Sequence, residues 1–396
     1  MTEKRYRNMN YRQVIVLCSI ILIGSGISLA KGPAVTFEKT PHGGIQPQAI
    51  ADASGTVHLL YYRGQPREGN LFYAHRAKGR KNFSAPLKVN SIVGSACCVG
   101  SIFRARMALG QDGIVHVLWN GSFGFVRKQW EKKGKQRTPE EFTYLFYARL
   151  ADDKKSFRTQ INLNRNTFGL DGNGSITTDR KGEVNVFWHA RVKGRPDRMV
   201  FRVRSTNNGN SFSAETPITR RPLGVCECCT LEAFTSSKGR LYVAYRTAEK
   251  TSRNVVIFSS GKPDSRFSEV HRHRWNIVAC PASTFAFAED DRRVYAAWET
   301  EGHIFVKDIL SATRAVNVSS ASKSGKYPSI AMNAKGDRLI TWSTETGWEK
   351  GGYIQYQVTD RDGAVSSGSN RPRHFPAAHS FSSSCGLPSG NFVVFY

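Results

Sequence analysis

Six polar residues occupy equivalent positions in this chain, each directly after the aromatic residue that ends a repeated segment. In chain order they are Tyr62, Asn120, His189, Arg246, Glu299 and Ser343, with Arg63 and Arg191 close behind two of them. Guanidinium groups bind carboxylates and sulfates through forked donors. Arg63, Arg191 and Arg246 are therefore candidate ligands for an anionic group, and Asn120 would add a neutral polar contact to the same substrate.

The same set contains groups suited to proton transfer. A carboxylate serves as a general acid or base, and an imidazole gains and loses a proton near neutral pH. Glu299 is thus the candidate acid or base, and His189 is the candidate proton shuttle. Because these groups come from different repeats, we interpret them as one site; the alternative is that each is an ordinary solvated strand end.

The cysteines form a second set with possible chemistry. Apart from Cys18, they are Cys97, Cys98, Cys226, Cys228, Cys229, Cys280 and Cys385. In an exported chain we expect disulfides, such as Cys226 or Cys228 to Cys280, and the odd number leaves at least one thiol over. The alternative is zinc or copper bound by the thiolates of the four cysteines from Cys226 to Cys280, with His189 nearby. We rank disulfides first because the Cys-x-Cys-Cys run differs from an ordinary zinc knuckle.

The elements that must position these residues come from a repeat of seven copies. They are Gly55–Tyr61, Gly113–Trp119, Gly182–Trp188, Gly239–Tyr245, Arg292–Trp298, Gly336–Trp342 and Gly390–Tyr396. Each copy has a turn, a β-branched run and an aromatic residue six positions after its start. A period of this size, built from short strands, is typical of a β-propeller blade. The sequence therefore predicts an all-β propeller, with seven blades favoured and six as the alternative.

The repeat also predicts where the two sets lie. The seventh copy ends at Tyr396, so a strand at 34–38 should complete its blade and join the two ends of the chain without an exposed edge. The polar set ends the second strand of each blade, and the cysteines precede or lie in the innermost strands. Both sets should meet on one face around the axis. The basic segment Val126–Arg137 is expected to be a solvated loop that rises from this face.

Residues 1–30 have the pattern of an export signal. A basic stretch precedes the uncharged apolar run from Val14 to Leu29, which ends in small residues; the alternative is an uncleaved anchor over residues 13–30. We expect a periplasmic or extracellular protein with a single domain at 31–396, touching a membrane only through its N-terminal segment. The net charge of +26 would suggest nucleic acid, but export removes that partner and no reading motif is present.

One further motif points to a family. Ser205–Phe212, Ser-Thr-Asn-Asn-Gly-Asn-Ser-Phe, fits the Asp-box pattern with Asn207 in place of the aspartate. With the seven-copy repeat, the chain resembles the sialidase (neuraminidase) superfamily of BNR/Asp-box propellers, in particular the exported sialidase-like proteins of planctomycete-type bacteria. The resemblance covers about residues 40–396.

The resemblance implies a monomer that binds and processes an acidic glycan at the axial face. Sialidases bind the substrate carboxylate with three arginines and use a tyrosine nucleophile assisted by a glutamate. Arg246, Glu299 and either Tyr62 or Tyr245 match those residue types. The family's early Arg-Ile-Pro motif is absent, since the first blade reads Gly44-Ile-Gln-Pro47.

Three functions remain open on the sequence. The first is a carbohydrate-active enzyme, either an exo-α-sialidase-like hydrolase or a uronic-acid lyase in which His189 or Tyr245 abstracts a proton while Arg246 neutralises the carboxylate. The second is a non-catalytic glycan-binding or scaffold propeller. The third is a metal or redox protein that uses the cysteines. No cofactor is expected for the first two, whereas zinc or copper would belong to the third.

Overall fold

The computed structural model describes residues 32–100, 103–132, 134, 144–170, 172–192, 197–219, 224–261, 266–319, 324–347, 349–369, 371 and 373–396. The expected export segment at 1–30 lies outside these residues. Within them, none of the helices has the length and apolar character needed to cross a membrane.

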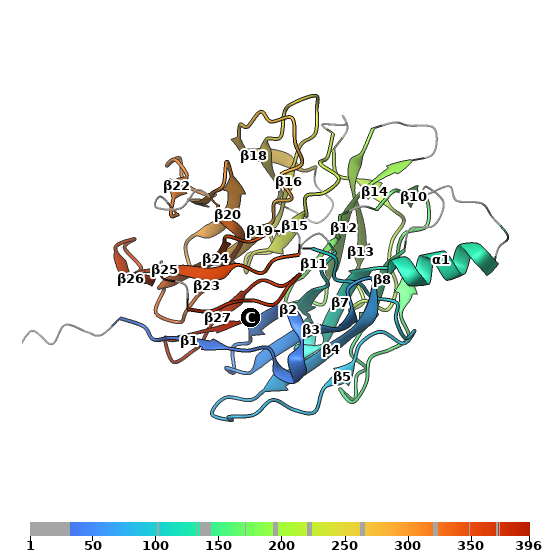
Figure 1. Ribbon diagram of the computed structural model, residues 1–396, viewed down its shortest axis with the longest axis horizontal. Coiled ribbons are helices and arrows are strands. Elements are labelled where there is room, and N and C mark those ends of the chain that lie inside the picture. The colour runs from blue at the N-terminus through green and yellow to red at the C-terminus, as the bar shows by residue number, and fades with distance from the viewer. Residues whose placement is uncertain are drawn as a thin grey trace, which may run out of the picture. The chain divides into compact units, whose positions relative to one another are not determined.

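The described strands form seven separate sheets, and each sheet is one blade of a β-propeller (Figure 1). In blades one, two, four, five and six, four antiparallel strands pair in chain order from the innermost to the outermost. The prediction of seven blades is therefore confirmed, and the six-bladed alternative is wrong.

Within the described residues, only one helix is longer than one turn, and it lies in blade two. Blade one consists of β2 (Ile45–Ala51), β3 (Val57–Gln65), β4 (Glu68–Arg76) and β5 (Leu87–Lys88). Blade two consists of β6 (Arg106–Leu109), β7 (Val115–Asn120), β8 (Leu145–Arg149) and β9 (Ile161–Asn162), with helix α1 (Phe123–Lys132) between β7 and β8. Blade three consists of β10 (Thr167–Phe168), β11 (Ser175–Thr178), β12 (Val184–Val192), β13 (Met199–Ser205) and β14 (Thr216–Pro217).

The other four blades follow the same order along the chain. Blade four has β15 (Glu232–Thr235), β16 (Leu241–Arg246), β17 (Val255–Ser260) and β18 (Ser268–His273), and blade five has β19 (Phe285–Glu289), β20 (Val294–Thr300), β21 (His303–Asp308) and β22 (Val316–Asn317). Blade six has β23 (Lys326–Met332), β24 (Arg338–Thr344), β25 (Tyr353–Thr359) and β26 (Val365–Ser369). Blade seven has β27 (Ser383–Gly386), β28 (Phe392–Phe395) and β1 (Val35–Glu38).

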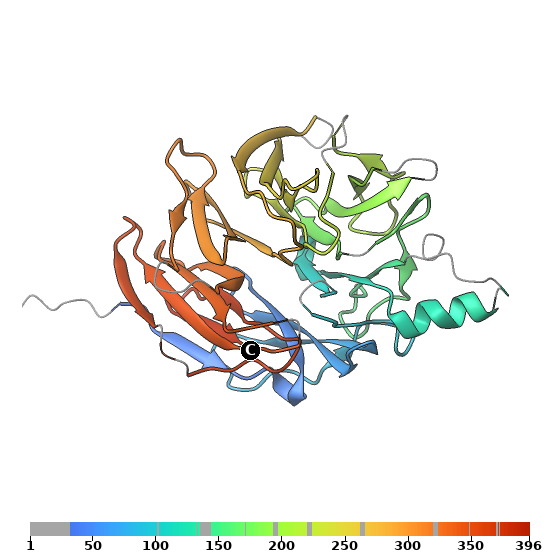
Figure 2. The ribbon, with the colours of Figure 1, turned by 45° about the horizontal axis from the view of Figure 1, so that its top comes forward.

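Blade seven joins the two ends of the propeller. β1 pairs in parallel with β28, with Val35 opposite Phe392 and Glu38 opposite Phe395. The pairing continues past the strands, because the Thr40 N–H donates to the Tyr396 carbonyl at 2.7 Å. Figure 2 shows β1 in blue beside the red strands of the last blade. The predicted completion of this blade by the strand at 34–38 is confirmed.

The aromatic residue of each repeat packs between neighbouring blades. Six of the seven are buried: Tyr61, Trp119, Trp188, Tyr245, Trp298 and Trp342. Burying a large apolar side chain stabilises a fold by roughly 2–3 kcal/mol, so these positions hold the blades at their angles around the axis. The seventh, Tyr396, is half-buried at the chain end.

The part of the basic insertion that the structure describes as far as Lys132 lies in helix α1 rather than in the expected loop. The Phe125 N–H donates to Ser122 Oγ at 3.0 Å, so Ser122 caps the first turn of α1. Lys128 Nζ donates to Glu68 Oε1 at 2.7 Å and joins the helix to blade one. The segment lacks a long apolar stripe, and its helix depends on this cap and on docking against the neighbouring blade.

The Ser205–Phe212 segment forms a tight turn between β13 and β14. Gly209 N–H donates to Ser205 Oγ at 2.9 Å, and Ser211 N–H donates to Asn207 Oδ1 at 3.0 Å. Gly209 has φ of +78°, a conformation that glycine adopts without strain. Phe212 then packs edge-on against Tyr147, with ring centroids 4.9 Å apart. The segment therefore has a structural role in linking blades two and three.

We expect the ring closure to depend on main-chain pairing of β1. The carbonyls of Ala34 and Glu38 accept bonds from Phe392 and Tyr396, so Thr36 between them directs its own N–H toward β28. Thr36→Pro removes that donor and should lower the free energy of unfolding by about 1–3 kcal/mol. Urea unfolding measures this change. Thr36→Ala is the control, because the exposed side chain contributes little; equal midpoints for both variants would contradict the role of the pairing.

Candidate functional site

The predicted polar set lies on one face of the propeller, called here the site face. Strand register places the first residues of each inner strand beside the last residues of the second strand, as in Ile45 opposite Tyr62 and Lys326 opposite Ser343. Most of the set is buried below this face: Tyr62, Asn120, His189, Arg246, Glu299 and Ser343 are each 5% exposed or less. The set supports the loops above it.

The three arginines expected to clamp an anion are each bound to separate partners. Arg246 donates to the main-chain carbonyls of Arg253 and Glu299 and lies 4.9 Å from the Trp275 ring centroid. Arg191 pairs with Glu227 at 2.7 Å, and exposed Arg63 lies over a ring of its own blade. Burial lowers the pKa of Arg246, although nearby thiols and Glu299 oppose that shift. The structure does not assemble the predicted three-arginine clamp.

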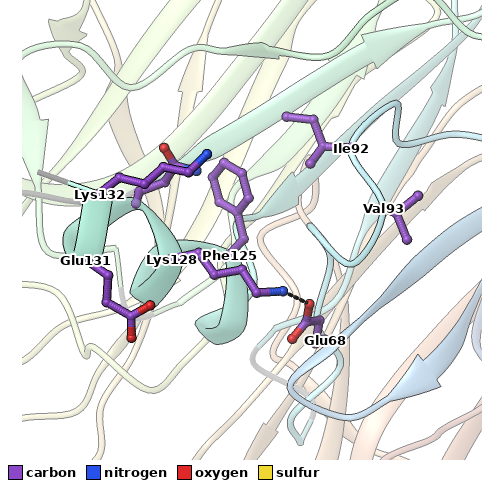
Figure 3. Close-up of a pocket in the computed structure, with 8 residues that line it drawn as sticks. Glu68, Ile92, Val93, Phe125, Lys128, Glu131 and Lys132 are labelled. Atoms are coloured by element: carbon purple, nitrogen blue, oxygen red, sulfur yellow. Dashed lines mark hydrogen bonds and ion pairs between the residues drawn. The ribbon is translucent and has the colours of Figure 1, made fainter.

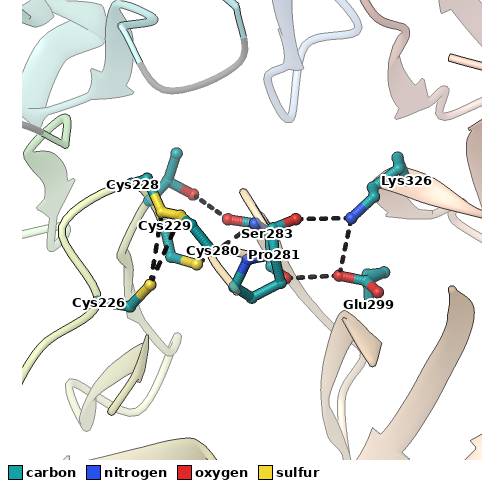
Figure 4. The surroundings of a disulfide bond; sticks show 9 residues. Cys226, Cys228, Cys229, Cys280, Pro281, Ser283, Glu299 and Lys326 are labelled. Atoms are coloured by element: carbon teal, nitrogen blue, oxygen red, sulfur yellow. Dashed lines mark hydrogen bonds and ion pairs between the residues drawn. A yellow bond between two sulfur atoms is a disulfide. The ribbon is translucent and has the colours of Figure 1, made fainter. Parts of the chain in front are cut away.

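Glu299 has partners on both carboxylate oxygens. Ser283 Oγ donates to Oε2 at 2.5 Å, and the Gly302 N–H donates to Oε1 at 2.9 Å. Lys326 Nζ lies 3.4 Å from Oε2 and also donates to the Pro281 carbonyl at 2.6 Å (Figure 4). Glu299 is 1% exposed. The carboxylate therefore joins blades five and six, and no substrate can reach it as the side chains stand.

His189 is fully buried and neutral. Burial lowers its pKa to about 3, and the charge of Arg198 contributes to the shift. Its Nε2 faces the main chain at Gly172, where any Cβ would collide with the ring. Asn120 Nδ2 donates to the carbonyl of the same glycine at 2.8 Å. His189 and Asn120 thus fix the loop at Gly172, which differs from the proton-shuttle and substrate-binding roles expected for them.

The two tyrosines proposed as nucleophiles are also engaged. Tyr245 lies in the core between blades three and four, with its ring stacked 5.8 Å from Phe258. The Tyr62 hydroxyl donates to the Gln65 carbonyl. Burial raises the pKa of both phenols well above their ordinary value. Neither hydroxyl is placed to attack a ligand on the site face.

A site that the sequence reasoning missed lies on the axis itself. A cavity of about 370 Å³ runs between the inner strands of all seven blades. Two arginines of blade two, Arg104 and Arg106, line it together with Glu232 of blade four. The sequence feature that could have identified this site is a pair of arginines at alternate positions in an otherwise apolar segment, Arg104-Ala-Arg-Met-Ala-Leu109, which leads into the inner strand β6.

Two buried cations share one carboxylate at this position. Arg104 Nη2 lies 3.7 Å from Glu232 Oε2, and Arg106 contacts the same carboxylate. Arg104 also lies 5.1 Å from the Phe381 ring centroid of blade seven. Burial lowers the pKa of Arg104 to about 10. Among the described residues, Arg104 Nε and Nη2 and Arg106 Nε have no hydrogen-bond acceptor.

Four cysteines gather at the edge of the site face between blades four and five (Figure 4). Cys228 and Cys280 form a disulfide, one of the two pairings left open by the sequence. Cys226 Sγ lies 3.6 Å from Cys228 Sγ and 3.9 Å from Cys280 Sγ. A hydrogen bond with Cys229 lowers the pKa of Cys226, whereas burial raises the pKa of Cys229.

The other three cysteines in the described part of the chain do not join this cluster. Cys97 and Cys98 are buried thiols in the connection between blades one and two. Cys385 is packed in the core formed by blades seven and one, where burial raises its pKa to about 12. The expectation that all seven cysteines project near the axis on one face is therefore wrong for Cys385, because its side chain points between two blades.

A second cavity opens beside α1, with a volume of about 510 Å³ (Figure 3). Ile92, Val93 and Phe125 supply apolar surface. The charged residues of the lining are two lysines and two glutamates: Lys128, Lys132, Glu68 and Glu131. The loop of Ile92 and Val93 and the start of α1 both leave strand ends at the site face. The two carboxylates balance the two ammonium groups, so this cavity offers no net positive charge to a ligand.

Comparison with known proteins gives structural neighbours only. No protein-family profile and no curated protein sequence matches the chain. An α-L-arabinofuranosidase from Fusarium graminearum superimposes with a TM-score of 0.53 at 10% identity, over 81% of this chain and 93% of its own. A Penicillium chrysogenum α-L-arabinanase gives 0.52 at 9% identity, over 82% and 95%. An intramolecular trans-sialidase from Ruminococcus gnavus gives 0.45 at 14%, over 88% of each. At these identities the likeness shows the fold alone.

The buried, neutral state of His189 predicts a pH-dependent stability. Its pKa is about 3 when folded against 6.5 for an ordinary histidine, so below pH 6.5 the unfolded chain binds the extra proton and stability falls. Between pH 7 and pH 5 this costs about 2 kcal/mol. His189→Gln should reduce the loss of unfolding free energy over that interval by this amount in urea titrations. Exposed His42→Gln should match the unmodified protein, and an unchanged loss in His189→Gln would refute the assignment.

Proposed function

We propose that this chain is an exported, monomeric propeller that binds an acidic glycan at its site face. The observation that carries the proposal is the pair of buried arginines, Arg104 and Arg106, that share the single carboxylate of Glu232 on the axis. Two guanidinium groups against one carboxylate leave a local excess of one positive charge. A carboxylate or sulfate of a sugar would balance it.

The guanidinium groups of the two axial arginines have hydrogen-bond donors without acceptors in the described part of the chain. Buried polar groups are normally hydrogen-bonded, and an uncompensated buried charge destabilises a fold by several kcal/mol. Arg104 and Arg106 keep donors without acceptors among the described residues, and both line the axial cavity. An anion that enters the cavity supplies acceptors where the protein has none, so binding there is favoured by charge and by hydrogen bonding.

Three observations favour a carbohydrate as the bearer of that anion. The Ser205–Phe212 sequence resembles the Asp-box pattern of the sialidase superfamily, with Asn207 in place of the aspartate, and its turn is hydrogen-bonded through Ser205 and Asn207. The arabinanase that shares the fold was solved with arabinobiose, so a carbohydrate is among the ligands of such propellers. The net charge of +26 attracts polyanions over a long range. Sialosides, uronic-acid polymers and sulfated polysaccharides all meet these conditions.

The proposal is for binding rather than for bond cleavage. The expected catalytic residues Glu299, His189, Tyr62 and Tyr245 are buried and bonded within the protein. A hydrolase or a lyase needs a carboxylate, imidazole or phenol that reaches its substrate. Turnover of an acidic glycan would therefore contradict this part of the proposal while leaving the site face as the binding surface.

Arg104→Gln tests the axial site. We expect the full chain to bind at least one of sialosides, uronic-acid polymers or sulfated polysaccharides, and to bind it about 10- to 100-fold more weakly after this substitution, as expected for loss of a charged hydrogen bond. Isothermal titration calorimetry gives the dissociation constants, and product analysis of the same mixtures detects turnover.

Arg63→Gln is the matched control, because it removes the same charge from an exposed position in blade one. It should change affinity less than twofold, whereas Glu232→Gln should strengthen binding by removing the competing carboxylate. Equal losses in Arg104→Gln and Arg63→Gln would reduce the interaction to nonspecific charge attraction. Binding of neutral polysaccharides with the same affinity, or no binding of any acidic glycan, would overturn the proposal.

A further inference from the structure

We propose that Cys226, Cys228, Cys229 and Cys280 form a binding site for a thiophilic divalent cation, represented by Zn²⁺, when the Cys228–Cys280 disulfide is reduced. The four sulfur atoms lie within 4.8 Å of one another. This site shares no residue with the axial arginines, and its proposal does not rest on the proposed glycan.

The sulfur positions fit tetrahedral coordination. Zinc binds thiolates at about 2.3 Å, so the sulfurs of a tetrahedral site are about 3.8 Å apart. Cys226 Sγ lies 3.6 Å from Cys228 Sγ and 3.9 Å from Cys280 Sγ. Opening the disulfide lets Cys228 and Cys280 move apart by side-chain rotation, as the tetrahedron requires. Cys229 Sγ lies within 4.8 Å of the other three sulfurs.

The backbone supplies a metal-binding turn. Cys226 and Cys229 are separated by two residues, the spacing of a zinc knuckle, and the Cys229 N–H closes the turn on the Cys226 carbonyl at 3.2 Å. The sequence prediction ranked disulfides ahead of a metal because it compared the whole Cys-x-Cys-Cys run with a zinc knuckle. It did not consider Cys226 and Cys229 as a pair. Cys280 completes the set from the connection that leads into blade five.

The surroundings offset the negative charge of such a site. Four thiolates around a divalent cation carry a net charge of −2, which needs nearby cations and donors. The Ser283 N–H donates to Cys229 Sγ at 3.4 Å. The positive charge of Arg246 acts on Cys229 and Cys226, and Arg253 adds a second positive charge near Cys226. These contacts resemble the outer-shell donors that orient metal ligands.

The site is open on one side. Cys226 and Cys229 are buried, Cys228 is half-buried and Cys280 is exposed. An external dithiol can therefore reach the disulfide: it donates two electrons, becomes a disulfide itself and leaves two protein thiols. Each thiol that then binds the cation releases its proton to solvent. Disulfide and metal both join the loops of blades four and five, so the site face keeps its cross-link in either state.

Metal titration of the full chain tests the proposal. The protein is reduced with a dithiol, freed of reductant without oxygen, and titrated first with Co²⁺ and then with Zn²⁺. We expect one equivalent of Co²⁺ with the absorption of tetrahedral thiolate coordination, displaced by one equivalent of Zn²⁺. The oxidised protein should bind at least 100-fold more weakly. Cys229→Ser should lose at least 100-fold in affinity, while Cys385→Ser, a buried thiol outside the cluster, should match the unmodified protein.

A second measurement does not depend on variants. Alkylation of the reduced, folded protein followed by mass spectrometry should show that Zn²⁺ protects the four cluster cysteines and leaves the reactivity of Cys97, Cys98 and Cys385 unchanged. The proposal is overturned if the reduced, folded protein binds less than one equivalent of either metal. Equal losses in Cys229→Ser and Cys385→Ser, or a disulfide that opens only on unfolding, would also overturn it.

Discussion

Parallel pairing of β1 with β28 is the contact on which the rest of this propeller depends. Each blade packs against its neighbours, and the last blade is joined to the first both through a shared core and through β1. The four paired residues of β1 supply that tie from the opposite end of the chain. With the ring closed, the buried aromatic residues of the repeats fix the blade angles, and the inner strands enclose a cavity rather than a cleft.

Closure has a consequence for the polar residues near the axis. Strand ends that would face water in an open sheet lie under the loops of the neighbouring blade, so their polar groups need partners inside the protein. Gln46 is an example: its Nε2 lies within hydrogen-bond distance of the carbonyls of Cys98, Gly100 and His379, which belong to two different stretches of chain. Arg246 and Glu299 satisfy loops in the same way. Much of the polarity at this face is thus structural.

The strands could be predicted from the sequence because every copy of the repeat contains a turn, a β-branched run and an aromatic residue at the same offset. An aromatic residue at a fixed offset must fill an interblade gap, and this holds at Trp188 and Trp298 alike. The surroundings of the polar strand ends could not be predicted, because the loops that cover them do not follow the repeat. Tyr245 and Arg246 are adjacent and both buried, yet Tyr245 packs in the core and Arg246 binds main-chain carbonyls. The axial site of Arg104 and Arg106 was not predicted because no other blade has an equivalent pair of arginines, so the repeat did not point to it. Helix α1 was not predicted because it is stabilised by the Ser122 cap and by the contact with Glu68 rather than by an apolar stripe.

The axial arginines and the cysteine cluster are linked through blade six. Tyr327 has φ of +55° at a register shift between Lys326 and Ser329, so consecutive side chains of this strand leave in different directions. Lys326 reaches the Pro281 carbonyl, next to Cys280, while the ring of Tyr327 lies 5.9 Å from that of Phe381, which covers Arg104. Gln46 in blade one has the same left-handed conformation at an equivalent shift. Consecutive residues of one bulged strand therefore contact the loop of Cys280 on one side and the ring that covers Arg104 on the other.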